Sequence, residues 1–244
     1  MIPFPTTLPA RLFRPLFEFV FPPVCYHCGR RLDVAGGRLC AGCWSSVQTV
    51  RVEDRIYQGA MRRLSTDGLI AGLATRFYFE KDGPLQSLIH ELKYGGMTAV
   101  GVELGREVAS SVEELLGDLR IAGIIPVPLH RGRLRERGYN QSEQIARGIA
   151  AVTGFPVCNR FLRRARYTES QTTLSIEDRR RNVAGAFSPF HSALPSIAGG
   201  NFLIVDDVIT TGSTICECSR VLLDSGAERM FACSLALADR SWIA

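Results

Sequence analysis

The sequence predicts an α/β domain in which helices connect the strands of a mostly parallel sheet. From about residue 69 onward, strand-like and helix-like segments alternate, and such alternation requires crossover connections between parallel strands. The apolar run at 202–205 is continuous rather than alternating, which is typical of a central strand buried on both faces. With 46% hydrophobic and 22% charged residues in 244 positions, the chain is long enough for a sizeable core.

Each expected element has a local signal. In chain order they are a strand at 69–79, helices at 84–94 and 103–117, a strand at 121–128, a helix at 140–154, a strand at 201–207, a helix at 213–225 and a strand at 229–237. The first two helices carry apolar residues at three- and four-residue intervals. Gly154 and Pro156 stop the third helix, and Gly226 closes the fourth.

The remaining stretches suggest a second, smaller unit at the N-terminus. We predict an N-terminal segment with a cysteine module at 1–50, a linker at 51–68 that is polar and basic without a clear period, and the α/β domain at 69–244. The apolar run at 16–21 is interrupted by Glu18 and flanked by prolines, unlike a secretory signal. No segment is long enough for stable membrane insertion, so we expect a cytoplasmic protein. A net charge of +5 hints at anionic ligands without by itself indicating nucleic acid.

Four of the eight cysteines form two CxxC pairs, Cys25 with Cys28 and Cys40 with Cys43, separated by 11 residues. Each pair presents two thiolates, and two such pairs complete a tetrahedral Zn²⁺ site of the zinc-ribbon kind. All four ligand positions are filled, which indicates a structural site. Without a secretion signal, the pairs favour metal in a reducing compartment over disulfides. A redox motif is the weaker alternative, since it would not need two pairs.

The most informative stretch is FLIVDDVITTGST at 202–214. The predicted strand ends in Asp206 and Asp207, at the edge where ligands bind in parallel sheets. Gly212 permits a tight turn into a helix that starts near Ser213 and whose N-terminus suits a phosphate. The hydroxyl groups that could hydrogen-bond its oxygens belong to Thr210, Thr211, Ser213 and Thr214.

Known phosphate and nucleophile motifs do not explain this stretch. It lacks the lysine of a P-loop, the GxGxxG of a dinucleotide site and the GxSxG of a nucleophile elbow. A phosphate nest preceded by two acids fits a sugar phosphate, with the phosphate in the nest and the sugar hydroxyls on the carboxylates. The alternative, a strand followed by an Asp-capped turn, explains one aspartate well and two adjacent aspartates poorly.

FLIVDDVITTGST resembles the 5-phosphoribosyl-1-diphosphate (PRPP) motif of type I phosphoribosyltransferases, with four apolar residues, two acids, two variable residues and a TGxT-like end. Three further stretches resemble the ComF family: ELKYGG at 91–96, PVPLHRGRLRERGYNQSEQIA at 126–146 and ESQTTLSIEDRRRNVAGAF at 169–187. The resemblance covers about residues 20 to 240. It implies a type I phosphoribosyltransferase fold, PRPP and Mg²⁺ as ligands, and an association with DNA uptake in competence.

The resemblance also implies roles for residues. Asp206 and Asp207 would hold the ribose hydroxyls and stabilise positive charge at the anomeric carbon, while residues 210–214 would hold the 5′-phosphate. The diphosphate, bridged by Mg²⁺, would lie on a loop formed by Lys93, Tyr94 and Gly95. On the residues alone, that loop could equally be a glycine helix cap with an exposed lysine.

Arginines flank the proposed site in two stretches. Those expected to contact diphosphate, or to belong to a loop at 160–181 that closes over it, are Arg135, Arg137, Arg164 and Arg166. A solvated basic segment, or one that binds a nucleic-acid backbone, is the alternative. Nearby, Asn140 is predicted as a helix N-cap, and Tyr139 either stacks on a base or packs in the core.

The sequence therefore predicts transfer of a phosphoribosyl group from PRPP to an unidentified acceptor. Such a reaction needs charge stabilisation more than a strong base, and the chain shows no nucleophile or triad pattern. One alternative is a nucleic-acid-binding competence factor, with single-stranded DNA or competence proteins as partners, that keeps the fold without turnover. Another is a sensor that binds PRPP without using it.

Overall fold

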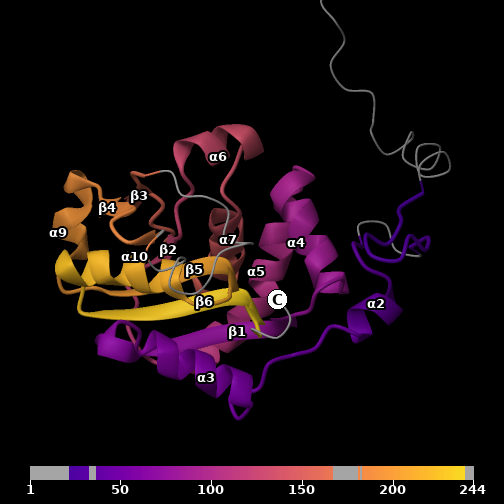
Figure 1. The fold of residues 1–244 in the computed structure, drawn as a ribbon, viewed down its shortest axis with the longest axis horizontal. Helices are drawn as coiled ribbons and strands as arrows, with labels where there is room; N and C mark the ends of the chain where they lie inside the picture. The colour runs from indigo at the N-terminus through magenta and orange to yellow at the C-terminus, as the bar shows by residue number, and fades with distance from the viewer. Residues whose placement is uncertain (1–21, 33–36, 167–180, 182, 240–244) are drawn as a thin grey trace, which may run out of the picture.

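The computed structural model describes residues 22–32, 37–166, 181 and 183–239. At its centre lies a four-stranded sheet with the order β1-β6-β5-β2, crossed by helices on both sides (Figure 1). Every neighbouring pair in this sheet is parallel. The strands are β1 (Gly72–Phe79), β2 (Gly123–Pro126), β5 (Asn201–Ile209) and β6 (Arg229–Ala238). The predicted mostly parallel sheet is confirmed.

Helices bury both faces of the sheet. The helices of the main domain are α3 (Arg55–Leu64), α4 (Pro84–Tyr94), α5 (Thr98–Leu116), α6 (Arg131–Arg137), α7 (Gln141–Thr153), α9 (Leu194–Ile197) and α10 (Ser213–Asp224). Side chains alternate along β5: Phe202 and Ile204 pack with α3 and α10, whereas Leu203 and Val205 pack with α4, α5 and α7. This two-sided burial explains the continuous apolar run that marks the strand in the sequence.

The smaller elements lie around this sheet. They are α2 (Ala41–Ser45), the 3₁₀ turns η1 (Thr66–Gly68) and η3 (His191–Ala193), and the antiparallel pair β3 (Leu162–Arg164) and β4 (Phe187–Pro189). The helices expected at 84–94, 140–154 and 213–225 form within one residue of those limits. Among the described residues, no helix has the length and apolar character needed to cross a membrane.

The stretch expected as a linker contains a helix instead. In α3, Tyr57, Ala60 and Leu64 are buried against the sheet, and the Tyr57 hydroxyl donates to the carbonyl oxygen of Leu73 at 2.7 Å. These positions have helical spacing, but arginine and polar residues between them conceal the period in the sequence. The helix is therefore part of the main core.

The arginine-rich stretch after β2 is also helical. Arg131–Arg137 forms α6, whose N-cap His130 accepts a hydrogen bond from the N–H of Gly132 at 3.2 Å. Residues two positions apart lie on nearly opposite sides of a helix. The alternating arginines of this stretch consequently do not form a single row.

The cysteine module is joined to the exposed edge of the sheet. The Val50 N–H donates to the Arg76 carbonyl at 2.9 Å, and the Tyr78 N–H donates to the Gln48 carbonyl at 2.9 Å. Residues 48–50 thus pair antiparallel with the edge strand β1, and covering such an edge prevents unwanted pairing. The ring of Trp44 contacts that of Phe77 edge-on, with centroids 5.8 Å apart.

Candidate functional site

The two adjacent carboxylates lie at the carboxyl end of β5, and other elements supply a partner to each. Ser142, in the first turn of α7, donates through Oγ to Oδ1 of Asp206 at 3.1 Å. Lys93, at the end of α4, places Nζ 2.6 Å from Oδ2 of Asp207. Only 14% of the Asp207 side chain is exposed. Two segments distant in sequence from β5 therefore reach the predicted acids.

The environment makes Asp206 a weak acid. Burial, followed by the negative charge of Asp207, raises the pKa of Asp206 to about 7. The N–H of Asp207, the charge of Lys93 and the Ser142 hydroxyl act in the opposite direction and partly offset this rise. Near neutral pH the group can hold or release a proton, and a ligand that donates hydrogen bonds or carries a cation would favour the ionised form.

We expect the unliganded protein to lose stability as pH rises toward 7. A folded pKa of about 7 lies above the ordinary value of 3.8, so the stabilising contribution of protonated Asp206 is complete below pH ~4 and is lost as pH rises through 7. Asp206→Asn should remove this component and raise Tm at pH 8 relative to the parent, by about 2–4 °C per kcal/mol recovered. Thermal melts at pH 5 and pH 8 measure it.

Asp224→Asn is the matched control, because that side chain is 66% exposed. It should leave the difference in Tm between pH 5 and pH 8 as in the parent. If Asp206→Asn shows the same pH dependence as Asp224→Asn, the raised pKa is wrong.

The loop after β5 turns into α10 around a glycine. Gly212 has φ 81° and is the N-cap residue of α10. The Thr211 and Ser213 hydroxyls lie 2.9 Å apart, and the Ser213 N–H donates to Thr211 Oγ1 at 3.4 Å. A hollow of about 30 Å³ is lined by Asp206 and residues 208–215. The predicted loop residues thus surround one small polar hollow at a helix N-terminus, where an anion is favoured.

Replacing Gly212 with alanine should lower the free energy of unfolding by about 2–5 kcal/mol. Left-handed backbone costs a non-glycine residue about 1–2 kcal/mol, and overpacking costs about 1–3 kcal/mol. The second cost applies because a Cβ at Gly212 would lie 2.5 Å from Cδ2 of Leu64 in α3. Urea unfolding of Gly212→Ala measures the sum.

Gly199→Ala isolates the backbone cost, since Gly199 has φ 71° and no heavy atom within 4 Å of the added Cβ. A Gly212→Ala/Leu64→Ala double variant should be less destabilised than the sum of the single variants, because the clash is then absent. Strict additivity would show that Leu64 does not support the loop.

The predicted diphosphate loop is only partly arranged for an anion. Lys93 reaches the carboxylates, as described above. Tyr94 is 62% exposed, and the guanidinium of Arg137 lies 5.1 Å from the centre of its ring. The Gly95 N–H donates to the Glu91 carbonyl at 2.9 Å, as the residue after a helix does. In this conformation the stretch is a glycine helix cap with one lysine directed to the site.

The four predicted arginines lie in different surroundings. Arg164 stands over the ring of Phe187 at 5.2 Å, and burial together with a neighbouring arginine lowers its pKa, against the opposing charge of Asp206. Arg166 donates to a backbone carbonyl at 2.7 Å, Arg135 is exposed, and Arg137 contacts Tyr94. Arg164 is therefore the one of the four with a described electrostatic link to the acids. Most of the predicted closing loop, 167–180, lies outside the described residues.

Two contributions escaped the sequence prediction, namely Ser142 beside Asp206 and Leu64 beneath Gly212. A signal for Ser142 existed, because it lies two residues after the predicted N-cap Asn140. That cap is confirmed: Asn140 Oδ1 accepts from the Ser142 N–H at 3.2 Å. Tyr139 packs in the core, where its hydroxyl donates to the Leu92 carbonyl.

The four predicted zinc ligands form one cluster. The Sγ atoms of Cys25, Cys28, Cys40 and Cys43 all lie within 4.8 Å of one another, and those of Cys28 and Cys40 are 3.7 Å apart. Zn–S bonds of about 2.3 Å at tetrahedral angles place neighbouring sulfurs about 3.8 Å apart. The donor set and its spacing thus fit a structural Zn²⁺, and the four thiolates fill its coordination sphere.

Comparisons with known proteins find matches to both the α/β domain and the cysteine module. Family models for a phosphoribosyl transferase domain and a double zinc ribbon domain match residues 135–242 and 16–55. Competence protein F of Haemophilus influenzae is 30% identical over 88% of this chain and 96% of that protein. DNA utilization protein YhgH of Escherichia coli K12 is 35% identical over 59% of this chain and 63% of that protein. Competence protein ComFC of Bacillus subtilis is 24% identical over 83% of this chain and 79% of that protein.

Proposed function

The chain belongs to the ComF family, and from this premise we propose that it binds PRPP with Mg²⁺ and transfers the phosphoribosyl group to an acceptor. The observation that carries the proposal is the joint position of an acid pair and a small polar hollow at a helix N-terminus, both at the end of one central strand. Asp206 lines that hollow, and Lys93 lies beside Asp207. The acid pair would bind the ribose of PRPP, the hollow would bind its 5′-phosphate, and Lys93 would bind its diphosphate.

The 5′-phosphate would lie in the hollow at residues 210–214. Its oxygens would accept from the N–H groups in the first turn of α10, which have no acceptor within the helix. The hydroxyl groups of Thr211 and Ser213 already face each other at 2.9 Å and could turn to donate to the same anion. The partial positive charge of the helix N-terminus adds to this preference.

The ribose hydroxyls would donate to Asp206 and Asp207. The diphosphate would compete with Asp207 for Lys93, whose ammonium lies 2.6 Å from that carboxylate. Exchange of this ion pair releases Asp207 for the sugar and places the cation on the leaving group. The Ser142 hydroxyl keeps Asp206 oriented.

The residues present are compatible with Mg²⁺. This ion prefers oxygen ligands, retains several waters, and is usually bound by one or two carboxylates together with substrate phosphates. Two partly buried carboxylates beside the small hollow offer such donors. When bound, Mg²⁺ would neutralise charge on the departing diphosphate.

The chain's own contribution to the chemistry is charge stabilisation. As the bond from the anomeric carbon to diphosphate lengthens, positive charge develops on the ribose ring, and ionised Asp206 and Asp207 stabilise it. Lys93 stabilises the negative charge that accumulates on the diphosphate. The acceptor supplies the electron pair for the new bond, so no covalent intermediate with the protein is required.

The named relatives are competence and DNA utilization proteins. We extend the same setting to this chain and propose that its PRPP chemistry serves the uptake or use of DNA. A zinc–thiolate cluster is typical of a reducing compartment, which supports a cytoplasmic location.

Calorimetric titration of the zinc-loaded chain with PRPP, with and without Mg²⁺, tests the proposal. We expect saturable binding that requires Mg²⁺, and slow diphosphate release that a true acceptor accelerates. If a folded, zinc-loaded chain shows no binding, the sugar-phosphate site is contradicted and nucleic-acid binding becomes the leading function. Binding without release under any acceptor would favour a PRPP sensor.

A further inference from the structure

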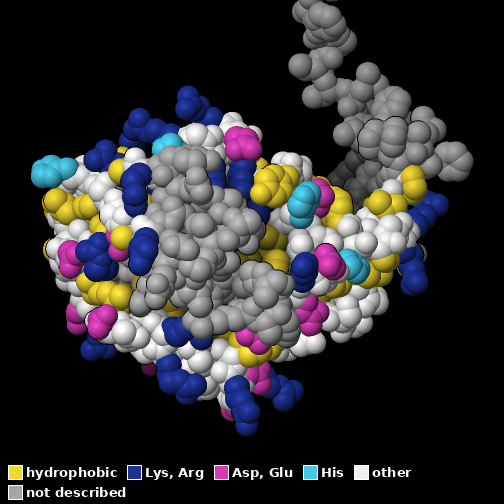
Figure 2. All heavy atoms as spheres, in the orientation of Figure 1, with side chains coloured by type: hydrophobic (Ala, Val, Ile, Leu, Met, Phe, Trp, Pro, Cys, Tyr) yellow, Lys and Arg dark blue, Asp and Glu magenta, His cyan; other side chains and the backbone are white. Residues whose placement is uncertain are grey.

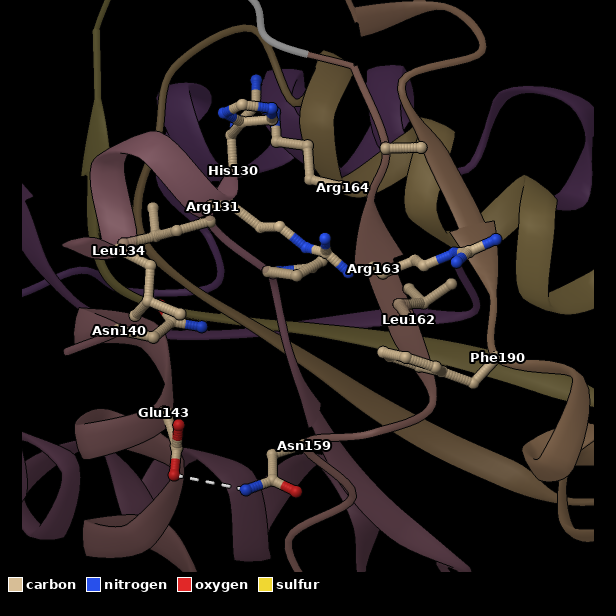
Figure 3. A pocket seen from close by; sticks show the side chains of 13 residues that line it. His130, Arg131, Leu134, Asn140, Glu143, Asn159, Leu162, Arg163, Arg164 and Phe190 are labelled. Carbon is tan, nitrogen blue, oxygen red and sulfur yellow. Dashed lines mark hydrogen bonds between the residues drawn. The ribbon is translucent and has the colours of Figure 1, made fainter.

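A second, larger cavity lies beside the proposed sugar-phosphate site. It has a volume of about 640 Å³, within the range of about 300–1,000 Å³ that is typical of small-molecule sites. Its walls come from the residues after β2, from α6, from the start of α7, and from β3 with the residues around it (Figure 3). It shares no lining residue with the small hollow of the phosphate loop.

One end of the cavity is strongly basic. Among the described residues that line it are three arginines, Arg131, Arg163 and Arg164, and one carboxylate, that of Glu143. Ser188 orients Arg163, whose Nε donates to the serine Oγ at 3.0 Å. Figure 2 shows basic side chains gathered over α6 and the β3–β4 pair on the visible face. The side chains of Arg131, Arg163 and Arg164 point in different directions (Figure 3), and a guanidinium group beside a cavity favours a ligand with a phosphate.

One side of the cavity is apolar and partly aromatic. Leu162 is buried in this wall, and the ring of Phe190 lies next to it (Figure 3). The guanidinium of Arg163 lies 5.8 Å from the centre of the Phe190 ring. Leu134 of α6 lines the cavity and is 41% exposed. A flat heterocycle could pack on such a surface, since base stacking on aromatic rings tolerates any base.

The opposite end of the cavity offers hydrogen-bond donors and acceptors close together. Glu143 and Asn159 face each other there (Figure 3), and Asn159 Nδ2 donates to Glu143 Oε1 at 3.3 Å. The same carboxylate oxygen accepts from Arg147 at 2.7 Å, which fixes its position. A carboxylate reads the amino group of a base, and a carboxamide can both donate and accept. This end therefore suits the hydrogen-bonding edge of an amino-bearing base.

We propose that this cavity binds a nucleotide, with the base against Leu162 and Phe190, its polar edge at Glu143 and Asn159, and its phosphate at Arg131 and Arg163. The same chemistry is offered by a free nucleotide, by the end of a DNA strand and by an internal nucleotide of a single strand. The proposal does not depend on phosphoribosyl transfer, because binding can be measured without PRPP.

Arg164, whose pKa is lowered by burial and then by Arg133, adds a partly buried guanidinium to the residues that line the cavity. The cavity is also adjacent to the acid pair: Asn140 lines it, and Ser142, two residues on, contacts Asp206. A bound nucleotide and PRPP would therefore lie side by side.

The test is calorimetric titration of the full zinc-loaded chain with 5′-dGMP, 5′-dTMP and deoxyguanosine, in the absence of PRPP. We expect dGMP to bind at least about tenfold more tightly than deoxyguanosine, because only dGMP has a phosphate that can accept hydrogen bonds from the charged arginines. dGMP should also bind more tightly than dTMP, which has no exocyclic amino group. Competition with a 5′-phosphorylated linear oligonucleotide and with circular single-stranded DNA separates the sources.

Displacement of dGMP by both DNAs indicates an internal nucleotide, displacement by the linear DNA alone indicates a strand end, and displacement by neither indicates a free nucleotide. Each of these outcomes supports the site. Absence of binding by dGMP and by both DNAs would overturn it.

Variants locate the binding within the cavity. Arg163→Ala and Glu143→Gln should each weaken dGMP binding at least about tenfold, whereas Arg229→Ala should not. Arg229 is exposed at the start of β6 and does not line the cavity, so it carries the same charge change elsewhere. Equal weakening by Arg163→Ala and Arg229→Ala would mean a non-specific charge effect and would overturn the assignment. Arg163 is exposed, and melting curves verify that Arg163→Ala leaves the fold intact.

Discussion

An Asp206→Ala/Asp207→Ala double variant is expected to lose Mg²⁺-dependent PRPP binding by at least about a hundredfold in Kd. Each hydrogen bond from a ribose hydroxyl to an ionised carboxylate contributes about 1.5–3 kcal/mol, and two of them exceed the 2.7 kcal/mol that corresponds to about a hundredfold. The loss of Asp207 frees Lys93 for the diphosphate, which offsets a small part of the effect. Calorimetric titration of parent and variant measures the difference.

The double variant is expected to remain folded, because burial and the neighbouring negative charge of Asp207 raise the pKa of Asp206, so that the ionised pair opposes folding. Asp224→Ala/Glu228→Ala is the matched control, since both side chains are exposed and the same two charges are removed. That control should bind PRPP as the parent does. Asp206→Asn/Asp207→Asn, which keeps the shape but not the charge, should behave like the alanine variant. Parent-like affinity in the alanine variant would refute the acid pair as the ribose site.

Removal of zinc is the second change with a large expected effect. Structural Zn²⁺ contributes on the order of 10 kcal/mol to the folding of small cysteine modules. A Cys28→Ser/Cys43→Ser variant, kept under reducing conditions, should therefore lose the order of the cysteine module. Because residues 48–50 pair with β1, we expect the effect to extend to the edge of the main sheet.

Amide hydrogen exchange measures how far the disorder extends. The Val50 and Tyr78 amides, each bonded across the module and β1 at 2.9 Å, should exchange much faster in the variant. The Leu203 amide in the central strand β5 should keep its protection. Cys158→Ser, outside the cluster, serves as the control and should change neither. Retained protection of Val50 and Tyr78 without zinc would show that the module folds independently of the metal.

The features that the sequence predicted correctly are those formed by residues close together in the chain. The strand, the acid pair, Gly212 and the start of α10 are consecutive in the chain, so their relative positions follow from strand and helix geometry alone. The zinc ligands are likewise two short CxxC turns whose thiolates need only to meet each other. The helices at 84–94 and 140–154 carry an uninterrupted apolar period with a cap or a glycine at their ends.

Sequence reasoning missed the features that depend on contacts between residues far apart in the chain. The arginine-rich residues 131–137 carry no apolar period, yet they form α6 under the N-cap of His130. The helix in the expected linker 51–68 exists because the sheet offers its apolar residues a core. For the same reason the sequence could not indicate that Leu64 of that helix supports Gly212.

The amino-acid sequence by itself determined the α/β class, the four-cysteine cluster and the acid pair with its glycine turn into α10, because each depends on residues close together in the chain. Only the tertiary structure decided which distant residues complete the site. The strand order β1-β6-β5-β2 brings Ser142 and Lys93 to the end of β5 and forms the arginine-lined cavity from separate segments. Strand order depends on the burial of all layers at once, whereas periodicity reports only which face of each element is apolar.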